Sequence, residues 1–477
     1  MKHMKKIIYI LPLAILAFSS VACNEIVDDA TINWAQWRAD AEANKNKPVY
    51  TTYTLNHPCL LHTQDDYEYV RQHKGEEPYS SALTKLKSGE FANTSYLPTT
   101  VTYLARLDAN NWGQLNGRWE DAGIADLWYN GIHNNYTNLM RDAAAAYQLA
   151  LLYKIEDNNA AADAAKNILV RWSIDNKGFL RNKNGELIDP NEKLILFQPY
   201  QLAIAAEMLR DYNAWGSTSE FNNVVKWLED VFYPVAHQQL EDQNNSGGGH
   251  YWFNWDLCAM ATVLSVGILS DNQDYINEAI MYYKGNGGGP GNIFKGVPFL
   301  HKDADSDEWL GQGNECGRDQ GHNTLCVAVL GLFCKMGLAI GDDLFAFDDY
   351  RALKYAEYTA KYNLAKEILY PDPMVSLAGM RVGESDSDFE YRHASFPFSE
   401  YTYGDAGTMT KPSDDGRGTV RPGWDYWAGY ANAHGVSAIY SNSFGKRMRP
   451  DGGGGHYGPN SGGFDQLGFS TLMGYRP

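Results

Sequence analysis

The chain has 477 residues, of which 44% are hydrophobic, so it is long enough to bury a large core in at most two or three domains. Its 40 basic and 58 acidic residues give a net charge of −18, which argues against nucleic acid as a partner. The charge still allows an anionic substrate, because a local cluster of Arg and His dominates the near field while distant charges are screened within about 10 Å.

Residues 1–22 are typical of a secretory signal peptide, with Lys2, Lys5 and Lys6 before an apolar run that ends in small residues. A transmembrane anchor is the alternative. The apolar run from Ile7 to Ala22 is shorter than the roughly 20 residues that a membrane span needs.

The stretch SSVAC at the end of this run resembles a bacterial lipobox, in which Cys23 is lipidated after cleavage, although Ser20 stands where a branched aliphatic residue is usual. The acidic NEIVDD that follows is similar to the export tails of Bacteroidetes lipoproteins. We therefore expect a secreted lipoprotein on the outer-membrane surface or in the periplasm, with residues 23–50 as a lipid-anchored tail and linker.

Helical periodicity dominates from residue 137. Apolar residues recur every fourth position in TNLMRDAAAAYQLALLYKI and again in AAADAAKNILVRW, which a short polar break separates, so we expect two antiparallel helices here. Further segments bring the total to at least eight helices from 137 to 366: FQPYQLAIAAEMLRDY, FNNVVKWLEDVFYPVAHQQL, NWDLCAMATVLSVGIL, QDYINEAIMYY, NTLCVAVLGLFCKMGLAI and YRALKYAEYTAKYNLA.

An all-α chain of consecutive hairpins is most simply closed as an (α/α) toroid of six or seven helical hairpins over residues 51–477. A superhelical solenoid is the alternative, but the sequence has no fixed repeat period. From residue 370 the chain is rich in Gly, Pro and aromatic residues, and we expect helix only around WDYWAGYANAHGV. This irregular C-terminal segment should fold over the toroid.

The cysteines form no CxxC pair and, apart from Cys23, are odd in number, so neither a disulfide scaffold nor a zinc site is suggested. We expect them to be buried as small hydrophobic residues. They are Cys59, Cys258, Cys316, Cys326 and Cys334.

A charged stretch, NECGRDQGHNTL, comes directly before an apolar run. If it forms the first turns of that helix, Glu315, Arg318, Asp319 and His322 stand at i, i+3, i+4 and i+7, on one face. An exposed capping turn with weak ion pairs is the alternative. The glycines in and beside the stretch cost helix stability and suggest that something comes close to the chain there. They are Gly313, Gly317 and Gly321.

Two other helix starts carry aromatic, amide and imidazole groups. One is GGGHYWFNWDLCAM and the other is DLWYNGIHNNYTNLMRD. An Asn at such a place can be a simple N-cap. Aromatic faces with amide and hydroxyl donors also suit a sugar ring, whose CH face stacks while its hydroxyls form hydrogen bonds.

Several blocks in chain order resemble the alginate lyase superfamily of helical-toroid polysaccharide lyases. The blocks are HPCLLHTQDDYEYVRQH, NWDLCAMATVLSVGILSDNQDYINEAIMYY, ECGRDQGHNTLCVAVLG, EYTAKYNLA and GGFDQLGFSTLMGY, which span about residues 55 to 475. Within the superfamily the chain is most similar to polysaccharide lyase family 38, whose members act on alginate or glucuronan.

The resemblance implies a polysaccharide lyase that cleaves 1,4-linked uronate polymers, alginate first among them, by β-elimination. A base takes the proton on C5 and an acid protonates the leaving O4. Because that proton lies next to a carboxylate, donors must first neutralise the carboxylate and then the dianionic intermediate.

The resemblance also implies roles for individual residues. Asn254 is the expected carboxylate-neutralising amide, Arg318 would hold an acidic group of the substrate with Glu315 orienting it, and His322 is the expected base or carboxylate partner. Related lyases carry Tyr where this chain has Gly321, so the acid is open: the candidates, in order, are Tyr251, Tyr426 and Tyr430.

Other residues are expected to bind the polymer, and the chemistry requires no metal or cofactor. The expected partner is an anionic polysaccharide, with membrane contact only through the lipid anchor. Trp255 stands where related lyases often carry His. The substrate-binding candidates besides Glu315, Tyr426 and Tyr430 are His133, Asn134, Tyr136, Gln198, His250, Trp255, Gln320, Arg392 and His393.

Three alternatives remain open. One is a glucuronan lyase of the same mechanism, and another is a non-catalytic glycan-binding lipoprotein. The third, a glycoside hydrolase on a similar toroid, needs two carboxylates that flank the scissile bond, for which Glu315, Asp126 and Glu400 could be proposed.

Overall fold

The computed structural model describes residues 48–106, 135–181, 184–246, 252–304, 306–369, 396–402, 407–418, 421–453 and 464–477. The predicted signal peptide lies outside the described residues. So do Cys23, Asp126, His133, Asn134, His250, Tyr251, Arg392 and His393.

The first predicted hairpin is confirmed as α7 (Tyr136–Glu156) and α8 (Asn159–Asp175). Asp157 ends α7 in the left-handed region, with φ 53°, and its N–H donates to Tyr153 O. Asn158 then caps α8, because its side chain accepts the N–H of Ala161. The two-residue polar break therefore reverses the chain with both helix ends satisfied.

The other predicted helical segments are also confirmed, except that one of them forms two helices. The segment FNNVVKWLEDVFYPVAHQQL forms two helices, α10 (Ser219–Val231) and α11 (Tyr233–Ser246), which meet near Pro234, where the backbone lacks an N–H donor. The remaining helices are α3 (Gln64–His73), α4 (Tyr79–Ser88), α9 (Pro199–Met208), α12 (Phe253–Leu269), α13 (Gln273–Met281), α14 (Ile293–Gly296), α15 (Gln320–Ala339), α16 (Phe347–Leu369), α18 (Trp424–His434), α19 (Ile439–Met448) and α21 (Ser470–Met473).

Short irregular helices and small strand pairs connect these elements. The former are η1 (Glu90–Ala92), η3 (Pro190–Phe197), η4 (Tyr212–Ser217) and η5 (Tyr282–Asn286). The strand pairs are parallel β1 (Tyr103–Leu104) with β2 (Gly178–Phe179), antiparallel β3 (Phe299–Lys302) with β4 (Trp309–Gln312), and antiparallel β5 (Tyr401–Thr402) with β6 (Thr408–Met409).

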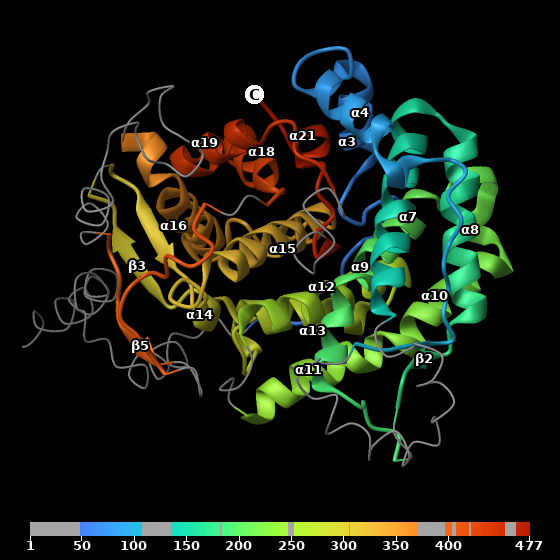
Figure 1. Cartoon of the computed structure of the whole chain (residues 1–477), viewed down its shortest axis with the longest axis horizontal. Helices are drawn as coiled ribbons and strands as arrows, with labels where there is room; N and C mark the ends of the chain where they lie inside the picture. The colour runs from blue at the N-terminus through green and yellow to red at the C-terminus, as the bar shows by residue number, and fades with distance from the viewer. Residues whose placement is uncertain are drawn as a thin grey trace, which may run out of the picture.

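The helices close into a ring. Going round it, α7 contacts α9, α9 contacts α12, α12 contacts α15 and α15 contacts α18. The ring closes because α18 contacts α21, α21 contacts α3 and α4, and α3 contacts α7 (Figure 1). Helices α8, α10, α11, α16 and α19 each pack against a member of this ring. This arrangement is the (α/α) toroid that the sequence predicts.

Two apolar helices form the centre of the molecule. Helix α12 is buried along nearly its whole length and contacts α9, α11, α13 and α15. Helix α15 is long and apolar enough to cross a membrane by length and composition alone, but 78% of its most apolar stretch is buried inside the protein. It is therefore a core helix, and its N-terminus and that of α12 carry the predicted site.

The C-terminal segment contains more helix than its composition predicts. Helix α19 was not expected, because IYSNSFGKRM contains Ser, Asn and Gly, which are weak helix formers. Glu357 on α16 accepts the N–H groups of Tyr440 and Ser441 in the first turn of α19, at 2.9 and 2.7 Å. A tertiary contact thus supplies the cap that the local sequence lacks, and α18 and α19 form part of the toroid itself.

The cysteines of the described residues are all buried and free, as predicted.

Candidate active site at the starts of helices α12 and α15

The charged stretch does not begin as a helix. Helix α15 starts at Gln320, and Asp319 is its N-cap in an extended conformation, with a side chain that accepts the N–H of His322 at 2.7 Å. The expected helical face from Glu315 to His322 is therefore wrong up to Asp319. Aspartate is favoured at this position because its side chain accepts a backbone N–H that has no partner within the helix, whereas it is less favourable in a helix interior.

The four charged side chains nevertheless meet. Arg318 lies 3.4 Å from Glu315 and 3.7 Å from Asp319, measured from guanidinium nitrogen to carboxylate oxygen. His322 Nδ1 lies 2.6 Å from the second oxygen of Asp319. The turn before α15 thus builds the cluster that a continuous helix was expected to build.

Asn254 belongs to the same cluster. The N-cap of α12 is Trp252, so Asn254 is not the cap; it lies buried in the first turn, and its backbone N–H lowers the pKa of the Glu315 carboxyl. Within the described residues, Asn254 Oδ1 has no hydrogen-bond partner. The guanidinium of Arg318 lies over the Trp252 ring, 5.3 Å from its centre. Glu315 and Arg318 therefore join the starts of α12 and α15.

The two carboxylates of this cluster are more buried than the guanidinium and the imidazole that they contact. Glu315 is fully buried, and burial raises its pKa although the positive charge of Arg318 opposes the rise. Burial would also raise the pKa of Asp319, but the hydrogen bonds from His322 outweigh it and leave the pKa below its ordinary value. The side chains of Arg318 and His322 are 30% and 39% exposed. Arg318 and His322 are thus partly accessible to solvent, whereas the carboxylates that hold them are more buried.

A second charged group, which the sequence did not predict, lies beside His322. Arg421 Nε donates to the carbonyl of Gly321 at 3.0 Å, and Arg421 also lies 3.4 Å from the Gln466 side chain. Burial raises the pKa of Asp465 to about 7, while the charges of Arg421, Arg106 and His322 oppose the rise. No local pattern signals this group, because closure of the toroid brings its members together.

Gln320, a predicted substrate ligand, serves the structure instead. Its side-chain amide donates to the carbonyls of Cys316 and Ser413, both at 3.1 Å. Its side-chain oxygen accepts from Asn323 at 3.1 Å and from Asn363 on α16 at 2.9 Å. The motifs GRDQGH and EYTAKYNL are thus linked physically, since α16 supports the start of α15.

Three other predicted ligands lie near these groups. Gln198 is buried, donates to the carbonyl of Phe464 at 3.4 Å, and its side-chain oxygen has no partner among the described residues. The Tyr136 ring lies 4.7 Å from the guanidinium of Arg106. Trp255 is half-buried in the first turn of α12. All three remain candidate substrate contacts.

The structure does not bring Tyr426 or Tyr430 to this cluster. Tyr426 is buried in the core near His62, with ring centres 6.4 Å apart, and burial raises its pKa well above the ordinary value. Tyr430 donates to Asp343 at 2.8 Å, beyond the C-terminal end of α15. That end is about 26 Å from His322 along a helix that rises 1.5 Å per residue.

Two of the three glycines, Gly313 and Gly317, allow close approach of protein side chains. A Cβ on Gly313 would lie 2.4 Å from the Tyr355 ring, and one on Gly317 would lie 2.6 Å from Met409. Gly321 is less constrained, with the Asp319 side chain 3.1 Å from such an atom.

The alginate lyase family model matches residues 108–287, a range that includes Asn254 and ends before Arg318. No curated protein sequence matches the chain.

Three solved structures of one enzyme are similar to the chain at 14% identity. A histidine-to-alanine variant of alginate lyase A1-III, in complex with a tetrasaccharide, has a TM-score of 0.51 and covers 91% of this chain and 99% of its own. Alginate lyase A1-III from Sphingomonas species A1 has a TM-score of 0.48, with 86% and 95% covered. A tyrosine-to-phenylalanine variant with a tetrasaccharide has 0.49, with 87% and 94% covered. At this identity the first likeness concerns the fold alone.

Proposed function

We propose that this chain is a polysaccharide lyase of the alginate lyase superfamily and that it cleaves 1,4-linked uronate polymers, alginate first among them, by β-elimination. The proposal depends most on one observation. Arg318 contacts the buried acid Glu315, His322 contacts the neighbouring Asp319, and the first turn of α12, which carries Asn254, lies against Glu315.

Charge neutralisation is the first task of such a site. The C5 proton of a uronate is scarcely acidic while the neighbouring carboxylate is fully charged. Arg318 is positioned by Glu315 and by the Trp252 ring, and the donor that Asn254 in the first turn of α12 would supply is its side-chain NH2 group. Groups held in place before the reaction stabilise developing charge without reorganising during it.

His322 suits the role of base. Its Nδ1 faces Asp319 at 2.6 Å, and an N–H donated there leaves a lone pair on Nε2 of the partly exposed ring. Asp319 thereby holds the ring in the basic tautomer. The acid that protonates O4 is assigned to Tyr251, which directly precedes Trp252 in the sequence. A tyrosine beside an arginine can have its pKa lowered, so that one hydroxyl can release and return a proton.

The hydrolase alternative has less support. Glu315 is buried and bonded to Arg318 and Asn254, whereas Glu400 is exposed, and Asp126 lies outside the described residues. A hydrolase needs one acid and one base or nucleophile across the scissile bond. A buried acid that holds an arginine serves neither role.

The deciding experiment assays the purified protein on polymannuronate, polyguluronate and glucuronan. Elimination leaves a conjugated double bond, so we expect ultraviolet absorbance to rise as the chains shorten, most strongly on an alginate polymer. A rise in absorbance on glucuronan alone would mean that glucuronan, and not alginate, is the substrate. New reducing ends without absorbance would establish a hydrolase, and saturable binding without shortening would establish a binding protein.

We also propose that the protein is exported as a lipoprotein anchored through Cys23, on the signal and lipobox pattern of the sequence. Wild-type cells fed a labelled fatty acid should yield labelled protein in the membrane fraction. The Cys23→Ser variant should lose the label and leave the membrane fraction. Equal labelling of the two proteins would remove Cys23 from this role.

A further inference from the structure

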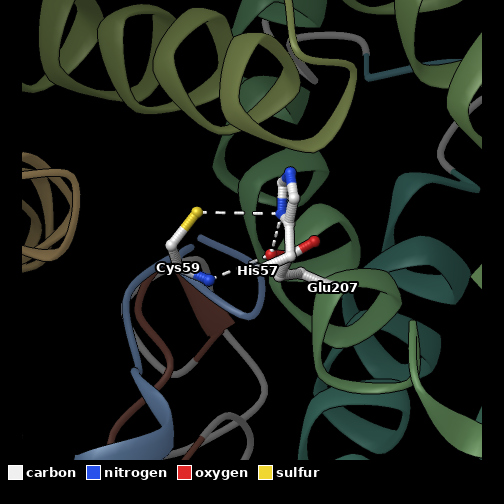
Figure 2. A group of neighbouring side chains, drawn as sticks. All are labelled: His57, Cys59 and Glu207. Carbon is white, nitrogen blue, oxygen red and sulfur yellow. Dashed lines mark hydrogen bonds and ion pairs between the residues drawn. The ribbon is translucent and has the colours of Figure 1, made fainter. Parts of the chain in front are cut away.

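A second group of reactive side chains lies far from the candidate active site. His57 and Cys59 come from the segment before α3, and Glu207 comes from α9. One ligand atom from each lies within 4.8 Å of the others: His57 Nδ1, Cys59 Sγ and a Glu207 carboxylate oxygen. Figure 2 shows the thiol, the imidazole and the carboxylate converging from the two segments.

The separations of the three atoms are close to those in a metal site. His57 Nδ1 lies 3.7 Å from Cys59 Sγ and 2.5 Å from Glu207 Oε1. Tetrahedral zinc, with bonds of about 2.0–2.3 Å, places its ligand atoms roughly 3.3–3.6 Å apart. The thiol therefore already stands at about the required spacing from the imidazole, and the imidazole and carboxylate need to separate by less than about 1 Å.

The groups around these three match the support that metal ligands receive. The other imidazole nitrogen of His57, Nε2, lies 3.0 Å from Asp271, and the other carboxylate oxygen of Glu207 accepts from Arg210 at 2.7 Å. Histidine ligands commonly give their second ring N–H to a carboxylate, which fixes the tautomer and the ring orientation. Here Nδ1 lies against Glu207 and can become a ligand once the proton between the two groups has left.

We propose that His57, Cys59 and Glu207 bind one zinc ion. Their nitrogen, sulfur and oxygen ligands are the set that zinc takes, and thiolate disfavours magnesium and calcium. The His57 side chain is 17% exposed, so solvent reaches one side of the group although Glu207 is buried. A water molecule would therefore fill the fourth position. Binding releases to solvent the thiol proton of Cys59 and the proton between His57 and Glu207.

The proposed zinc site lies away from the candidate active site. Glu207 is in the last turn of α9, and Asp271 follows the C-terminal end of α12, whereas Asn254 lies at the N-terminal end of α12. The helix rises 1.5 Å per residue, so the two ends of α12 are roughly 22 Å apart. The ion would clamp the segment before α3 to the ring, away from the reacting groups.

Cobalt substitution tests the site on the full-length protein. After chelator treatment and under a phosphine reductant, cobalt(II) should bind with one equivalent and give a thiolate-to-cobalt charge-transfer band. Cys59→Ala should abolish this band. The matched control Cys334→Ala removes another buried thiol, located in α15, and should leave the band unchanged.

A second variant covers the case in which Cys59→Ala fails to fold. Asp271 is 61% exposed, and Asp271→Asn keeps all three ligands while weakening the support of His57. It should lower zinc affinity by roughly 10–100-fold with unchanged far-ultraviolet circular dichroism. Absence of a charge-transfer band in the wild type would overturn the proposal and leave an ion pair only. A full band in Cys59→Ala, or unchanged zinc affinity in Asp271→Asn, would overturn it too.

Discussion

Replacing His322 with alanine should lower kcat/KM on the preferred uronate polymer by roughly 10²–10⁴-fold, the usual contribution of a positioned acid or base. The ring is the group that Asp319 orients, through the 2.6 Å contact at Nδ1. Folding should be unaffected, because the N-cap bond of α15 uses the backbone N–H of His322, which alanine retains. The loss should therefore appear in turnover with little change in thermal midpoint.

The control is His434→Ala. His434 is an exposed histidine at the end of α18 that bonds the main chain of Tyr430, and its removal should leave kcat/KM within experimental scatter. Initial rates from ultraviolet absorbance and melting curves on both variants check the prediction. Full activity in His322→Ala would remove this residue from the mechanism, and the base would have to be sought elsewhere.

The sequence predicted the helices well and their ends less well. Amphipathic spacing reports which residues a helix buries, so α7, α8, α12 and α15 could all be identified from it. It does not report what satisfies a helix end. Helix α19 depends on Glu357, a residue more than 80 positions away in the chain, for two of its first N–H groups.

The structure brings only some of the predicted site residues together, for a similar reason. Asn254, Arg318 and His322 lie in short local motifs, and the structure brings them together through Glu315. Arg421 and Asp465 approach them only because the ring closes. Gln320 lies in the same motif as Arg318 and His322, but its side-chain amide forms hydrogen bonds with other protein groups. Residue type and spacing cannot distinguish a side chain that faces a substrate from one that holds a neighbouring helix.

The proposed zinc ligands show the same limit. His57 and Cys59 are two residues apart, but Glu207 is about 150 residues later in the chain, so cysteine spacing gives no sign of them. Packing of the N-terminal segment against the end of α9 creates the group. A metal site of this kind can be found only from coordinates.

Replacing Asn254 with aspartate should reduce kcat/KM more than any neutral change at this position. Loss of one preorganised donor costs about 10²–10³-fold in kcat. The new carboxylate would in addition face the uronate carboxylate and lie near buried Glu315, which interacts with the first turn of α12 at the Asn254 backbone. Like charges brought together in a low-dielectric site repel strongly. We therefore expect the order wild type, then Asn254→Ala, then Asn254→Asp.

A control variant distinguishes the effect of the new charge on catalysis from an effect on folding. Asn222→Asp makes the same chemical change at an exposed position on α10, and it should leave both activity and thermal midpoint close to those of the wild type. Rates and melting curves of the three variants should show kcat falling stepwise at position 254 and nowhere else. Equal rates for Asn254→Ala and Asn254→Asp would mean that no substrate carboxylate approaches this side chain. Arg318 and Arg421 would then have to neutralise the uronate without the amide.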